Sequence, residues 1–291
     1  MSRNDTDKAP PTRIAMYLAS MDHSPTEQLG NPARWHTTVI VLSEGGEHFS
    51  LAGAVAKRLG CRDERLRKWS RNPSYRKHGT FETALTQEIR RYPVYIRAIS
   101  ARASTIKECY SHFINDLHLQ GLAIQVTKNN KPYLKFGPFA RVRLEGATQK
   151  GLITRSEPVA FDIIESQALP VLFICHFAIR VHQALMLTIK RTRPTLEWID
   201  WQLMHNKFPG DHKGPMGSLF GAIMSGAASA RLVAGNMLVG TFNNARDDEG
   251  SELADNVAGY LTERLHNEVN DAFASCGDKI VWEIWQPESG E

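Results

Sequence analysis

Three aspartates stand where folding could bring their carboxylates together around a divalent cation. Asp22 follows an apolar segment, Asp200 lies within a predicted strand, and Asp255 lies near the start of a predicted helix. Mg²⁺ and Mn²⁺ prefer oxygen ligands, and two such ions can activate water and stabilise the leaving oxygen in phosphodiester cleavage. We expect the three side chains to converge at one end of a mixed sheet, with Asp248 as a fourth metal ligand. The alternative is that they are ordinary turn, cap or first-turn residues.

Basic residues cluster between Lys57 and Lys77, a stretch that we call the basic segment. Its only acidic residues are Asp63 and Glu64, and Trp69 and Tyr75 are interleaved with the cations. Such a patch can neutralise phosphates while an aromatic side chain stacks on a base. The alternative is a solvated helix and loop. The predicted nucleic-acid contacts are Arg62, Arg65, Arg67, Lys68 and Arg71.

The pattern of apolar residues predicts the elements that must position these groups. Strands are expected at 13–21, 35–42, 92–100, 195–203 and 236–243, and helices at 47–59, 81–91, 104–119, 165–190 and 251–270. A hairpin is expected over 122–137, turning at Asn129-Asn130. Strands followed by alternating strands and helices predict one mixed α/β domain over 13–285, with a hairpin insertion at 121–165 and a disordered arm at 1–12.

Composition excludes several classes of protein. The chain has 291 residues, of which 42% are hydrophobic and 23% charged, with a formal net charge of +4. These values do not fit a disordered chain, a collagen-like repeat, a coiled coil or a disulfide scaffold. The longest apolar run, 169–179, is too short to cross a bilayer. The four cysteines show no paired spacing, and residues 1–12 lack the apolar core of a secretory signal, so we expect free thiols and a cytoplasmic location.

Two motifs near opposite ends of the chain resemble those of the domain-of-unknown-function 3800 family. MYLASMDHSP, followed by WHTTVIVL, resembles the family's opening strands, and GSELADNVAGYL resembles its closing helix with a Leu-Ala-Asp tripeptide. The resemblance spans roughly residues 13–270. It implies a ribonuclease H-like fold and a metal-dependent nuclease that uses Mg²⁺ or Mn²⁺. On this resemblance Asp22, Ser24 and Asp255 match family positions, whereas the motif does not secure Asp200 as the middle carboxylate.

The chain departs from the family motif beside Asp22. His23 stands where the family has Glu, and Pro25 stands where it has Gly. Proline removes a backbone donor and fixes φ, so the loop that would shape a metal site differs. We expect His23 to be an exposed loop histidine; its alternative role is a general acid or base.

The sequence is compatible with three functions. The first is a metal-dependent nuclease or phosphodiesterase, with a role in defence against foreign nucleic acid. The second, which the His23 and Pro25 departures favour, is a degenerate member that binds nucleic acid or a partner protein without cutting. The third is a subunit of a larger assembly or a homo-oligomer, with the apolar helix at 165–190 as its interface.

Overall fold

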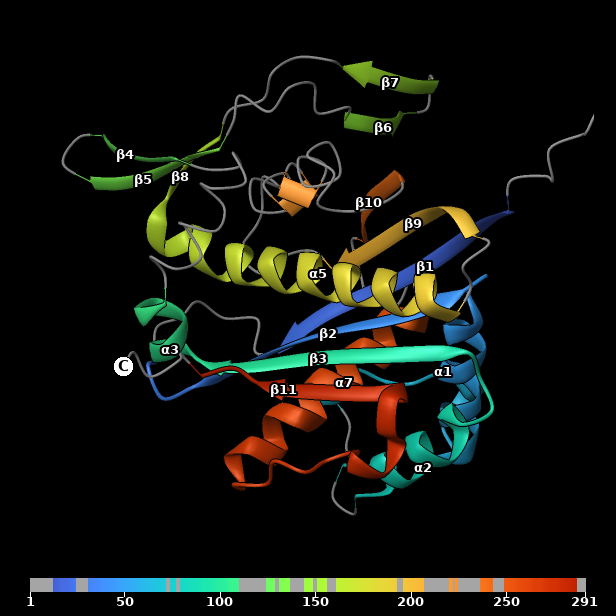
Figure 1. The fold of residues 1–291 in the computed structure, drawn as a ribbon. Coiled ribbons are helices and arrows are strands. Elements are labelled where there is room, and N and C mark those ends of the chain that lie inside the picture. Colours follow the sequence, from blue (N-terminus) through green and yellow to red (C-terminus); the bar gives the residue numbers. More distant parts are fainter. Residues whose placement is uncertain are drawn as a thin grey trace, which may run out of the picture.

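A six-stranded mixed sheet is the centre of the computed structural model (Figure 1). Strands β1 (Arg13–Ser24), β2 (Trp35–Glu44) and β3 (Val94–Arg102) form an antiparallel meander. Strands β9 (Leu196–Asn206) and β10 (Asn236–Phe242) add in parallel on the β1 side, and β11 (Ile280–Ile284) adds in parallel beside β3. The order across the sheet is therefore β10-β9-β1-β2-β3-β11.

The structure describes most of the sheet and its covering helices but leaves out parts of the connections. The described residues are 13–24, 31–71, 74–76, 79–109, 124–128, 131–136, 144–148, 151–155, 161–192, 196–206, 220–221, 223–224, 236–242 and 249–286. The predicted arm at 1–12 and the continuation of the predicted 104–119 helix beyond Cys109 lie outside these residues.

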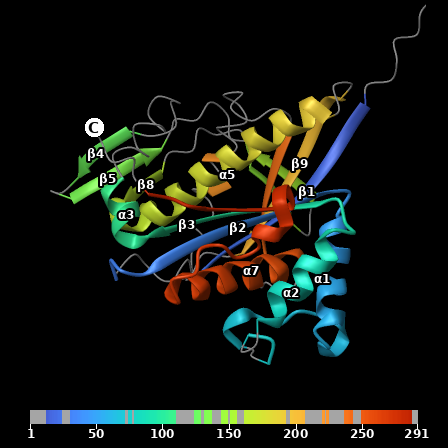
Figure 2. The same ribbon diagram turned by 60° about the horizontal axis from the view of Figure 1, so that its bottom comes forward.

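Helices cover both faces of the sheet (Figure 2). Helices α1 (Glu47–Arg58), α2 (Thr80–Ile89) and α7 (Glu249–His266) lie on one face, where α7 packs on β1 and β2. The long helix α5 (Glu165–Thr192) lies on the other face, and the short helix α3 (Ala103–Glu108) follows β3. The 3-10 turns η1 (Arg62–Glu64) and η2 (Trp69–Arg71) lie in the basic segment, and η4 (Ala274–Lys279) precedes β11.

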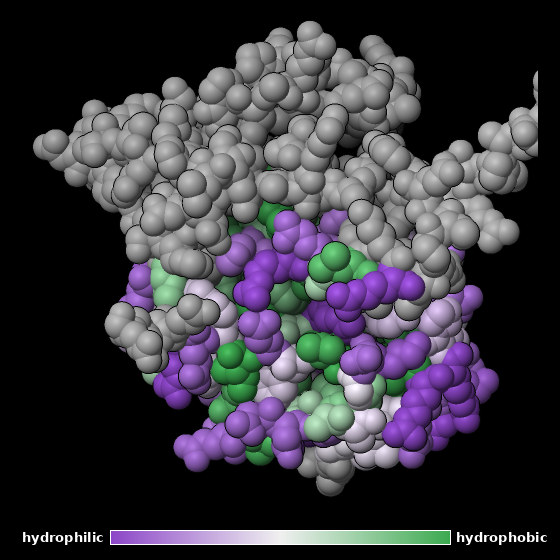
Figure 3. Space-filling view, viewed as in Figure 1, coloured by the Kyte–Doolittle hydropathy of each residue, from purple (hydrophilic) through white to green (hydrophobic). Residues whose placement is uncertain are grey.

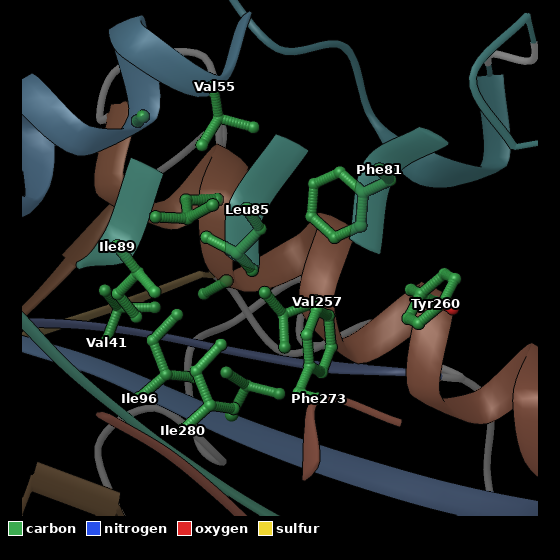
Figure 4. Close-up of a cluster of buried hydrophobic side chains, with 14 of the residues drawn as sticks. Val41, Val55, Phe81, Leu85, Ile89, Ile96, Val257, Tyr260, Phe273 and Ile280 are labelled. Atoms are coloured by element: carbon green, nitrogen blue, oxygen red, sulfur yellow. The ribbon is translucent and has the colours of Figure 1, made fainter. Parts of the chain in front are cut away.

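The main described core fills the space between the sheet and helices α1, α2 and α7 (Figure 4). Alternate residues of the meander, such as Val39, Val41 and Ile96, point into it because side chains alternate between the two faces of a strand. Val257 and Leu261 of α7 meet them from the helix side, four residues apart on one apolar stripe. The packing of α7 on the sheet therefore follows from the alternation of apolar residues along the strands and from the apolar stripe along the helix.

Smaller sheets lie between α3 and α5 in the sequence. Strand β4 (Ile124–Lys128) pairs antiparallel with β5 (Lys131–Phe136), which pairs with β8 (Phe161–Ile164). Strands β6 (Leu144–Thr148) and β7 (Gly151–Arg155) form a separate pair. Lys128 lies opposite Lys131, so β4 and β5 pair around the Asn129-Asn130 position where the sequence predicts a hairpin turn.

Most of the apolar residues at 169–179 in α5 are buried within the protein. Residues 169, 171–175 and 177–179 are all buried, whereas Leu187 is exposed, so an interface with another protein at this helix stays a prediction. No described helix is long and apolar enough to cross a membrane. On the face seen in Figure 3, hydrophilic side chains gather at the lower right, where α1 and α2 lie in Figure 1.

Candidate functional site

Asp22 lies inside β1, not after it, because the strand continues to Ser24. Its side chain is 4% exposed, and its Oδ1 accepts a hydrogen bond of 2.8 Å from the backbone N–H of His23. Ser20, two residues earlier and therefore on the same face, lies 3.1 Å through its Oγ from Nε2 of His48 in α1. A Cβ atom on Gly250 would lie 2.4 Å from that Oγ. Asp22 therefore faces the layer that contains the start of α7.

The register of β9 separates Asp200 from Asp22. Asp200 lies opposite Met16 of β1, six positions before Asp22, which corresponds to about 20 Å along the strand. Two aspartates separated by that distance cannot hold one metal ion. Met21 pairs with His205, so the β9 residue level with Asp22 is Asn206. The register therefore does not place Asp200 beside Asp22.

Asp255 of α7 is hydrogen-bonded to the basic segment. Its Oδ2 accepts a hydrogen bond of 2.7 Å from the backbone N–H of Trp69. Burial raises the pKa of the Asp255 carboxyl, whereas the Trp69 N–H and the nearby Lys68 lower it in part. Within the described part of the chain no group of three or more His, Cys, Asp or Glu side chains could hold a metal ion. Asp248 lies outside the described residues.

The basic segment lies against one stripe of α7. Nδ2 of Asn256 donates to the carbonyl oxygen of Arg67 (2.8 Å), and the Tyr75 hydroxyl lies 3.0 Å from Oδ1 of Asn256. Gly259 leaves room for the Trp69 ring, since a Cβ atom there would lie 2.3 Å from it. Asn256 is fully buried, so its polar groups must be satisfied within the protein.

Ion pairs join the same stripe to two cations of the basic segment. Arg65 pairs with Glu252 at 3.7 Å, and Nε of Arg76 lies 2.6 Å from Oε2 of Glu263. Glu263 also accepts a hydrogen bond of 3.1 Å from Nε1 of Trp69. The stripe consists of residues three or four apart, as one side of a helix requires. Its members are Glu252, Asp255, Asn256, Gly259 and Glu263.

Three of the five predicted phosphate-binding side chains remain available to a ligand. Arg62, Arg67 and Arg71 are exposed, and none of them forms an ion pair with any residue that the structure describes. Arg65 is paired with Glu252, and Lys68 is half-buried beside Asp255. Fewer cationic side chains are therefore available to bind phosphates than the sequence predicts.

The prediction that Trp69 and Tyr75 are available for base stacking is wrong. Their exposed fractions are 6% and 4%, and both rings pack in the core. Trp69 contacts Phe81 and Tyr260 edge-on, with ring centroids 5.6 and 5.7 Å apart. Interleaved aromatic residues in this segment are buried anchors, because they fill the space between α2 and α7.

His23 also differs from expectation, because it lies within β1 and is half-buried, not exposed in a loop. Burial lowers the pKa of His23 to about 4, with smaller contributions from His205 and His36. The ring is therefore neutral at physiological pH, and a general-acid role near pH 7 does not follow from this environment.

A described surface pocket of about 400 Å³ lies between α1 and α2 and is lined in part by residues of the basic segment. None of the predicted metal ligands lines it. Its lining residues are Arg58, Leu59, Ser74, Tyr75, Thr80, Thr83, Ala84 and Gln87.

Sequence reasoning missed Asn256, Glu252 and Glu263, which hold the basic segment. A usable signal was present: these polar residues recur at spacings of four and seven along a helix whose apolar stripe was recognised. Comparison of the chain with protein-family models, with curated proteins and with solved structures found no match.

Proposed function

We propose that this protein binds nucleic acid through the phosphate backbone, on a domain of the ribonuclease H-like type. The observation that carries the proposal is the set of exposed arginines, Arg62, Arg67 and Arg71, on a segment held against α7. Cations that neutralise phosphates release condensed counterions, so such a surface binds without reading sequence.

The sheet supports the fold part of the proposal. An antiparallel meander with two parallel strands beside its first strand, in the order β10-β9-β1-β2-β3, is compatible with a ribonuclease H-like domain. On this interpretation β11 is an added edge strand and residues 121–165 are an insertion. The resemblance of the two end motifs to the domain-of-unknown-function 3800 family points to the same fold.

Removing the three arginines tests nucleic-acid binding. For the triple variant Arg62→Ala, Arg67→Ala, Arg71→Ala, we expect weaker binding to a labelled DNA or RNA duplex. The slope of log K against log salt should shrink by about 2 to 3, because each lost phosphate contact on duplex DNA removes about 0.9. Fluorescence anisotropy over a salt series measures both quantities.

The matched control removes the same charge elsewhere. Arg90, Lys107 and Arg191 are exposed cations outside the basic segment, and their triple alanine variant should keep the wild-type salt slope. Equal losses in the two triple variants would assign the binding to net charge and remove the basic segment from the interface.

Metal-dependent cleavage is a second candidate, which the buried carboxylate of Asp22 on a central strand favours. Among the described residues no group of three or more His, Cys, Asp or Glu side chains could hold Mg²⁺ or Mn²⁺, and Asp200 lies about 20 Å from Asp22 along the sheet. We therefore assign no catalytic step to a metal ion.

An activity assay separates the two candidates. Labelled single- and double-stranded DNA and RNA are incubated with the wild-type chain, with and without Mg²⁺ or Mn²⁺. If cleavage occurs, Asp22→Asn should abolish it, because the amide keeps the shape but loses the charge that holds a cation. The exposed Asp63→Asn variant is the control and should retain wild-type rates. Binding without cleavage would leave the first candidate alone.

A further inference from the structure

Two neighbouring residues of α7 form hydrogen bonds with the backbone of the basic segment, and not with its charged side chains. Asp255 accepts from the N–H of Trp69 at 2.7 Å, and Asn256 donates to the carbonyl of Arg67 at 2.8 Å. The two bonded peptide groups flank Lys68, and Arg67 and Arg71 lie at and just beyond them in the chain. These hydrogen bonds hold the backbone that carries the cations and leave the charges of the Arg67 and Arg71 side chains unpaired by α7.

We propose that Asp255 and Asn256 are positioning residues, which hold the arginines of the basic segment in the arrangement that binds phosphates. The inference rests on the proposed function. It assigns to Asp255 a role that differs from the metal ligand implied by the family resemblance, and it assigns to Asn256 a role that the sequence did not indicate.

The local backbone explains why such anchors are needed. Residues 65–68 have no regular secondary structure, so no helical or strand ladder holds their peptide groups. Peptide groups that lose contact with water need other hydrogen-bond partners, and for these partly buried groups the partners are residues nearly two hundred positions later in the chain. A segment ordered in advance loses less conformational entropy when it binds, which strengthens binding to phosphates.

The two possible roles of Asp255 make opposite predictions for one conservative variant. Asn keeps an acceptor oxygen for the Trp69 N–H but removes the negative charge. If Asp255 positions the segment, Asp255→Asn should retain the hydrogen bond to Trp69 and bind as wild type, whereas Asp255→Ala should lose both. A metal ligand would fail in both variants, because the charge is what holds the cation.

The experiment compares Asp255→Ala, Asp255→Asn and Asn256→Ala with the wild-type protein. Amide hydrogen exchange over residues 65–71 reports the docking of the segment, and anisotropy with a labelled duplex over a salt series reports binding. We expect Asp255→Ala and Asn256→Ala to exchange about tenfold faster in this segment, bind about tenfold more weakly and show a smaller salt slope. Asp255→Asn should stay close to wild type in all three measurements.

Asn267→Ala, at an exposed asparagine just after α7, is the matched control and should change none of the readouts. Because Asn256 is fully buried, the Asp255 pair keeps the test interpretable if Asn256→Ala does not fold. Unchanged amide exchange over residues 65–71 in Asp255→Ala would overturn the positioning role. The proposed function would still be tested separately, by the binding of the arginine triple variant. Faster exchange with unchanged binding would instead mean that the segment is docked as described but is not the nucleic-acid interface.

Discussion

His36 is a buried histidine whose environment disfavours its charged form. It lies on β2 with 8% of its surface exposed, and its Nε2 has no hydrogen-bond partner among the described residues. Burial lowers the pKa of His36 to about 4, and the charge of Arg34 acts in the same direction. In the unfolded chain the ring has its ordinary pKa of about 6.5. Between these two values the unfolded state binds more protons than the folded state.

Stability should therefore fall as the pH drops from about 6.5 towards 4, and it should be insensitive to His36 above pH 7. A shift of this size corresponds to at most roughly 3.5 kcal/mol, at about 1.4 kcal/mol per pKa unit. In His36→Phe, which cannot protonate, the loss of stability over this range should be smaller. Urea unfolding at a series of pH values measures it.

His23 still titrates in that variant, since burial also lowers its pKa to about 4, so part of the acid sensitivity remains. His266→Phe, at an exposed histidine, controls for the introduction of a phenyl ring. An unfolding free energy that depends on pH equally in wild type and His36→Phe would contradict the prediction.

Helix α7 shows why a recognised helix does not disclose what its residues do. The apolar stripe through Leu253, Val257 and Leu261 is visible in the sequence and packs on the sheet as expected. The role of Asp255 was not visible, because its partner is the Trp69 amide in a segment without regular structure. Short elements were also missed: β11 is a five-residue edge strand whose pairing with β3 leaves no local signal.

Gly259 tests the close packing between α7 and the basic segment. A Cβ atom at this position would lie 2.3 Å from the Trp69 ring, which is itself enclosed by core aromatics. Gly259→Ala should destabilise the protein by roughly 1–3 kcal/mol, because overpacking forces neighbouring groups to move. Thermal or urea unfolding checks this value.

Gly53 provides the opposite case within α1. The nearest atom to a Cβ there is a carbonyl oxygen at 4.0 Å, so Gly53→Ala has room. It should stabilise by roughly 0.5–1 kcal/mol, because alanine loses less backbone entropy in a helix. If Gly259→Ala is as harmless as Gly53→Ala, then Trp69 is not packed against α7 as described.

At the scale of the molecule, the mixed α/β class and most of the sheet strands follow from the sequence. The lateral order of the strands does not, because parallel pairing of β1 with β9 joins residues about 180 positions apart and has no local signature. The predicted convergence of Asp22 and Asp200 depends on the same long-range pairing. Asp200 was correctly placed in a strand, but only the register shows that it lies opposite Met16 and not beside Asp22.

The position of β1 in the sheet has a consequence for biosynthesis. Its partner on one side, β2, follows within the first 44 residues, but the other side stays unpaired until β9 has been made. Helix α7, which covers β1 and β2, is translated later still. On the ribosome the nascent meander therefore exposes an open strand edge until β9 has emerged, and an apolar face until α7 has emerged. Pairing between strands so far apart in the sequence must close a long loop before it is rewarded, which slows folding and prolongs the exposure of apolar surface.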